Sequence, residues 1–126
     1  MGNRLQDILT TNFKTGRTGN EILKATRVQM TSEDIKGSIY THPMGYHGHA
    51  AGPTIGMWDN QGEVQGSGNY ALYPNTVYAI ELNAEVYIEE WKKPLRVMLE
   101  EGAYFNGEEV IYINGRQKDF LSISRQ

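Results

Sequence analysis

Two segments in the second half of the sequence alternate between apolar and other side chains, and they constrain the fold most. NTVYAIELNAEVYI spans residues 75–88 and PLRVMLEEGAYF spans residues 94–105, with the charged stretch EEWKK between them. A period of two residues is typical of a strand that turns one face toward a core. If the two strands pair through this turn, Glu81 and Glu100 converge on one side of a sheet.

The first part of the chain predicts two helices. Residues 3–13 carry apolar side chains at near-helical spacing: Leu5, Ile8, Leu9 and Phe13. Asn3 is the expected N-cap of this helix. In residues 18–30, Thr18 and Glu21 form the S/T-x-x-E pattern of a capping box. Two helices, a loop and then antiparallel strands predict a single α+β domain over residues 1–126.

Composition excludes several classes of partner and site. The net charge of −3 leaves no broad basic field, so we expect neither nucleic acid nor an anionic membrane surface as a partner. The sequence contains no run of 18 or more apolar residues, so it predicts no membrane-spanning helix. Because the chain has no cysteine, any metal site must use nitrogen and oxygen ligands.

A glycine-rich segment separates the helices from the strands and contains every histidine. Eight glycines lie from Gly37 to Gly68, and we expect an ordered loop that approaches another segment closely. His42, His47 and His49 fall within eight positions. Such a group is either a metal or catalytic site or a surface loop that collects imidazoles. His47 and His49 have the H-x-H spacing of cupin barrels, but the chain lacks the nearby glutamate that cupins need. We therefore set that fold aside.

The strand carboxylates offer partners for an imidazole. Glu81 lies among apolar residues, where a buried carboxylate needs a partner or a metal, although a solvated strand face would explain it equally simply. Glu100 shares its strand face with Arg96, whereas Glu101 faces the opposite side. One imidazole and two carboxylates on a rigid sheet suit Mn²⁺, Zn²⁺ or Co²⁺.

Three segments in this order resemble a known family. THPMGYHGHAAGPTIG, LYPNTVYAIELN and LRVMLEEGAYF are similar to the C-terminal lobe of the M24 metallopeptidases, with the Xaa-Pro aminopeptidase branch as the nearest match. The resemblance covers essentially the whole chain. It implies two N-terminal helices on a curved antiparallel sheet, as in part of the pita-bread fold.

The resemblance also implies roles for individual residues. His49, Glu81 and Glu100 match the metal ligands, His42 and His47 are left as catalytic or substrate-side histidines, and Arg96 is left to bind substrate. Family enzymes hold two divalent ions (Mn, Zn or Co) and remove the N-terminal residue from peptides with proline at the second position.

The chain departs from the family at two metal-binding aspartates, which belong to a hairpin before this region. None of the four aspartates here fits that pattern: Asp7, Asp34, Asp59 and Asp119. We therefore expect weak binding of a single metal, little or no peptidase activity, and either self-association or a missing N-terminal segment as partner. The alternatives are a non-catalytic peptide- or protein-binding module of the same fold, or an unrelated α+β protein.

Overall fold

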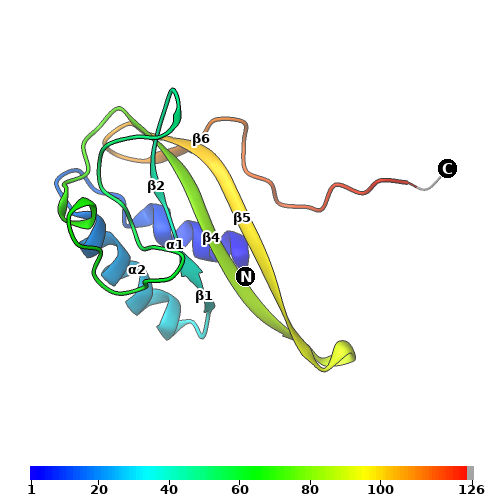
Figure 1. Ribbon diagram of the computed structural model, residues 1–126. Helices are drawn as coiled ribbons and strands as arrows, with labels where there is room; N and C mark the ends of the chain where they lie inside the picture. The colour runs from blue at the N-terminus through cyan, green and yellow to red at the C-terminus, as the bar shows by residue number, and fades with distance from the viewer. Residues whose placement is uncertain (125–126) are drawn as a thin grey trace.

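The computed structural model describes residues 1–124 and confirms the α+β class (Figure 1). Helices α1 (Gly2–Thr11) and α2 (Gly19–Ser32) pack on an antiparallel sheet. Its strands are β1 (Lys36–Ile39), β2 (His42–Gly45), β3 (Gly48–His49), β4 (Thr76–Ile88), β5 (Lys93–Phe105) and β6 (Val110–Tyr112). Short 3-10 turns lie at η1 (Ser67–Asn69) and η2 (Glu89–Trp91). Neither helix is long and apolar enough to cross a membrane, as judged over residues 1–124.

One helix start was predicted correctly and the other was not. Thr18 caps α2, and both hydrogen bonds of the capping box with Glu21 are present. Helix α1 begins one residue before the expected cap, with Met1 at the N-cap position and no side-chain capping bond. Asn3 therefore lies inside the helix, where its amide donates to Gln6 Oε1 and to the carbonyl of Gln117.

The long hairpin of β4 and β5 forms the centre of the sheet, in the order β3-β2-β4-β5-β6. Its register pairs all thirteen residues of each strand and places Glu81 directly opposite Glu100. The two carboxylates therefore lie on one side of the sheet, as predicted. Strands β1 and β2 both lie on the other edge of β4, with Ile39 opposite Leu82 and His42 opposite Ala79. They continue one line of pairing that is interrupted only at residues 40–41.

The helices cover one face of the sheet. Strand β4 turns Tyr78, Ile80 and Leu82 into the core, as the alternation predicted. The helices contribute Leu5, Ile8, Leu9, Ile22, Leu23 and Met30. Beneath β5, the buried amide of Gln6 donates to Glu101 Oε1 at 3.0 Å. Glu101 thus belongs to the helix side, while Glu100 lies on the opposite, exposed side.

The glycine-rich segment is an ordered loop, as expected. Ile55 exchanges two backbone hydrogen bonds with Thr41. The side chain of Gln61 bonds to both backbone groups of Ile39, and Asn20 of α2 bonds to both backbone groups of Val64. These polar anchors hold the loop against β1 and α2 although it has little regular structure.

Candidate functional site

Four of the six predicted site residues gather on the face of the sheet that the helices leave uncovered. Side chains alternate along a strand, so residues paired in register share a face. Glu81 pairs with Glu100, and His42 pairs with Ala79, two residues before Glu81. His49 pairs with Met44, two residues after His42. Strand parity therefore brings His42, His49, Glu81 and Glu100 to one side, and we call these four residues the His/Glu cluster.

His42 is the imidazole nearest to a carboxylate. Its Nε2 lies 3.7 Å from Glu81 Oε2, and its side chain is almost fully buried. Its Nδ1 lies 3.0 Å from the carbonyl oxygen of Pro43, which can only accept, so Nδ1 carries the proton. The lone pair of neutral His42 is thereby left on Nε2, the atom that faces Glu81.

His49 completes the pair of imidazoles. Its ring centroid lies 3.9 Å from that of His42 at an angle of 58°. Tyr40 lies against both rings, with centroids at 5.2 Å from His42 and 6.2 Å from His49. Unlike His42, His49 is exposed. The cluster thus offers one buried imidazole beside a carboxylate and one that solvent can reach.

The two carboxylates repel each other across the hairpin. Burial raises the pKa of Glu81, the neighbouring charge of Glu100 raises it further, and His42 and His49 act in the opposite direction. A folded-state pKa above the ordinary value means that the ionised form of Glu81 is disfavoured by folding. At neutral pH the carboxylate of Glu81 therefore destabilises the protein unless a cation compensates it.

We expect Glu81→Gln to stabilise the folded chain in the absence of metal. The amide removes the charge while keeping the shape, so the free energy of unfolding should rise by up to about 1 kcal/mol and Tm by about 3 °C. Thermal unfolding at pH 7 with a chelator measures this. Glu85→Gln, on the same face of β4 and opposite Arg96, is the matched control and should change Tm little. A lower Tm for Glu81→Gln would contradict the account of charge repulsion.

The donor types of the cluster fit a divalent cation that accepts nitrogen and oxygen ligands. Among residues 1–124, no group of three or more His, Asp or Glu side chains converges closely enough to hold a metal ion as it stands. His42 with Glu81, and Glu81 with Glu100, are neighbouring pairs. A bound ion would therefore require side-chain rotation at Glu81 or Glu100.

The other two predicted site residues do not join the cluster. His47 lies in the exposed turn between β2 and β3, where its ring packs edge-on against Tyr46 at 4.9 Å. Arg96 shares the open face but pairs in register with Glu85. It lies four positions before Glu100 along β5, which is ~13 Å in extended chain.

Sequence reasoning missed two residues that shape the site. Tyr40 packs on both imidazoles, and Thr41 fixes the backbone at Glu81. Thr41 Oγ1 donates to the carbonyl of Glu81 at 3.0 Å and lies 3.2 Å from its amide nitrogen. The alternation of Tyr40 and His42 in the stretch SIYTH was the signal that could have placed both on one face.

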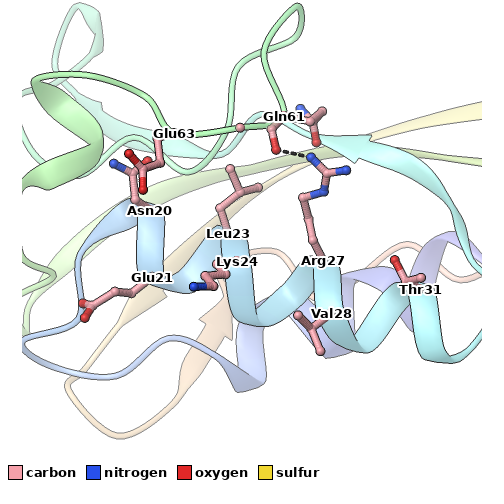
Figure 2. Close-up of a pocket in the computed structure, with 10 residues that line it drawn as sticks. Asn20, Glu21, Leu23, Lys24, Arg27, Val28, Thr31, Gln61 and Glu63 are labelled. Carbon is pink, nitrogen blue, oxygen red and sulfur yellow. Dashed lines mark hydrogen bonds between the residues drawn. The ribbon is translucent and has the colours of Figure 1, made fainter.

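A separate groove of about 670 Å³ lies on the outer side of α2, against residues 61–63. Figure 2 shows Arg27 reaching from the helix to the carbonyl of Gln61, so a hydrogen bond joins the two walls of the groove. Its charged lining residues carry both signs: Glu21, Lys24, Arg27 and Glu63. None of the lining residues belongs to the His/Glu cluster.

No protein-family model matches the sequence, and no curated protein sequence matches it. Among solved structures, the chain is similar to the X-Pro aminopeptidase from Thermotoga maritima MSB8, with a TM-score of 0.61. The two share a fold. Sequence identity is 18%, and the match covers 93% of this chain and 30% of that chain. The chain thus spans under a third of the length of that aminopeptidase and has the fold of a part of it.

Proposed function

We propose that this chain is a lobe of a metal-dependent aminopeptidase, related to those that act on peptides with proline at the second position. One observation carries the proposal. Glu81 lies opposite Glu100 on the neighbouring strand, and His42 Nε2 lies 3.7 Å from Glu81 Oε2. The similarity of fold to an X-Pro aminopeptidase supports it. We infer that the chain alone binds one Mn²⁺, Zn²⁺ or Co²⁺ ion weakly and hydrolyses such peptides little or not at all.

Within this proposal, the geometry favours His42 over His49 as the imidazole ligand. His42 is buried beside Glu81 and has its Nδ1–H fixed by the Pro43 carbonyl, an arrangement that orients Nε2 as ligating histidines require. Glu81 and Glu100 would supply the oxygen ligands. A divalent ion in such a site polarises a carbonyl and lowers the pKa of bound water. We propose that His49, which is exposed and lies beside His42, holds or transfers a proton at the open face.

We expect isothermal titration with Mn²⁺ or Zn²⁺ to detect weak binding to the wild-type chain. His42→Ala and Glu81→Ala should abolish the signal, because each removes a ligand from a pair. His49→Ala should weaken binding less than His42→Ala does, and this contrast separates the two imidazoles. His47→Ala is the matched control, since this exposed histidine lies in the turn and should leave binding unchanged.

The second candidate is a non-catalytic peptide- or protein-binding module of the same fold. Exposed aromatic side chains favour it, since Tyr46 is 98% and Trp58 is 74% exposed. The same titration distinguishes the two candidates. Absence of metal binding in the wild type, or binding that survives His42→Ala and Glu81→Ala, would support the binding module and contradict the metal-dependent function.

A further inference from the structure

Strand β5 has a long edge without a partner strand. Its inner edge pairs with β4 along the whole strand, whereas β6 pairs only with residues 103–105 of its outer edge. The outer edge over residues 93–101 has no partner strand within residues 1–124. In Figure 1, β4 and β5 extend together well beyond the helices as a twisted hairpin. An uncovered edge of this length is a template for pairing with another strand.

The backbone groups that point outward can be identified. The carbonyl of Gly102 accepts from Ile113 on the outer side, so Gly102 directs its backbone groups outward. The two backbone groups of a strand residue point the same way and alternate along the strand, and the register from 93 to 105 is continuous. Arg96, Met98 and Glu100 therefore direct their backbone N–H and C=O groups outward. No described residue bonds to these groups.

The side chains of the same three residues are complementary to themselves under a two-fold axis. Met98 is 62% exposed, and Arg96 and Glu100 are also exposed. Neither Arg96 nor Glu100 forms an ion pair within 4.0 Å with any of residues 1–124. A two-fold axis at Met98 would place Arg96 of each copy directly opposite Glu100 of the other, at the Cβ spacing where opposite charges attract.

We propose that two copies of this chain associate through antiparallel pairing of their β5 edges, with Met98 at the axis. This pairing satisfies the outward backbone groups of residues 96, 98 and 100 in both copies, and it flanks the axis with two Arg96–Glu100 contacts. It also joins the two sheets into one, with both His/Glu clusters on the same face. Because edge pairing buries little area, the dimer is weak and depends on concentration.

The C-terminal segment offers a competing explanation for association. Phe120, Leu121 and Ile123 are 85%, 88% and 96% exposed. The segment is tied to the helix side of β5 where the amide of Gln117 donates to Glu101 Oε2, and its residues 117–121 line hollows beside Met98 and Glu100. No hydrogen bond joins residues 113–124 to the outward backbone groups of Arg96, Met98 or Glu100. The apolar side chains of the segment could still drive association independently of β5, and the test must separate the two.

Light scattering coupled to size exclusion, over a series of loading concentrations, tests the proposal on the full chain. We expect wild type to shift from monomer toward dimer as concentration rises. Arg96→Glu and Glu100→Arg should each raise the dimer dissociation constant about tenfold or more, since each creates like charges opposite one another. The double variant R96E/E100R restores opposite charges and should return dimerisation to near the wild-type level.

Matched controls and three outcomes make the test decisive. Lys24→Glu on α2 and Glu90→Arg in η2 make the same charge changes away from the proposed interface and should leave the dimer intact. A wild type that stays monomeric throughout overturns the proposal, as does a double variant no better than the singles. So does loss of the dimer on changing Phe120, Leu121 and Ile123 to serine while the charge variants have no effect. The measurement reports the oligomeric state and does not depend on metal binding. A failure of the proposed metal binding would therefore leave this test unaffected.

Discussion

Replacing Gly56 by alanine should lower the free energy of unfolding by about 3 kcal/mol, an unusually large loss for the addition of one methyl group. Gly56 has a φ of +72°, a conformation that costs an alanine roughly 1–2 kcal/mol. A Cβ at this position would also overlap the carbonyl oxygen of Ile39, the last residue of β1. Because that atom belongs to the backbone of a paired strand, the loop must move away from the sheet.

The effect should reach the candidate site, since the neighbouring residue Ile55 bonds to Thr41 through both backbone groups. Thr41 in turn bonds to the backbone of Glu81 through its hydroxyl. Displacing the loop therefore loosens the strand segment that carries His42. We expect the proposed metal binding to be weaker in Gly56→Ala even at temperatures where the variant is folded.

Urea unfolding measures the loss, and Gly66→Ala is its matched control. Gly66 has the same φ of +72°, but a Cβ there would meet nothing within 4 Å. This control isolates the cost of the backbone conformation, so it should lose only about 1 kcal/mol. Equal losses in the two variants would show that the close approach to Ile39 contributes nothing.

The pairing of β4 with β5 was predictable from sequence because both strands keep one alternating pattern with one face in the core. A shift of one residue would have buried Glu81 and exposed Ile80, so the apolar pattern fixes the register. The connecting stretch EEWKK is short, which limits how far one strand can shift along the other. For these reasons the juxtaposition of Glu81 and Glu100 followed from the sequence.

The arrangement of the histidines was not predictable in the same way. Gly45 and Gly48 flank a tight turn, and the sequence does not say where the strands on either side begin. A boundary shifted by one residue would turn His49 to the opposite face of the sheet. The observed boundaries put His42 and His49 on one face and leave His47 in the turn. Tertiary pairing with β4, which lies more than thirty residues away, decides this outcome.

The prediction that Asn3 caps α1 was wrong, and the contacts of Asn3 show why. Asn3 has the right side chain for a cap, but the helix begins earlier in the chain. The carbonyl of Met1 accepts the first helical hydrogen bond, from the amide of Leu5. The amide of Asn3 then serves a contact that only the folded chain provides, with Gln117 near the other end of the sequence. Capping preferences compete with such distant partners, and here the distant partner prevailed.

We expect the largest loss of stability, 3–5 kcal/mol, from Phe105→Ala. Phe105 is fully buried at the end of β5, where Thr76 of β4 and Val110 of β6 flank it in register. Its ring packs edge-on against Phe13 with centroids 5.9 Å apart, and Phe13 packs in turn against Tyr78 at 5.1 Å. Truncation leaves a cavity between the sheet and the segment that follows α1. Because the surrounding core is already close-packed, the cavity can close only if the segment or the sheet moves.

Urea or thermal unfolding measures this loss, and two controls define its origin. Phe105→Leu keeps most of the volume and should lose less than half as much, whereas Phe120→Ala at an 85% exposed position should lie within about 0.5 kcal/mol of wild type. A small loss for Phe105→Ala would mean that the aromatic group does not hold the helices to the sheet. Metal binding supplies a further contrast with Gly56→Ala, because Phe105 lies on the helix side and five residues beyond Glu100. The proposed metal binding should be unchanged in folded Phe105→Ala. This contrast separates a residue that supports the core from one that positions the His/Glu cluster.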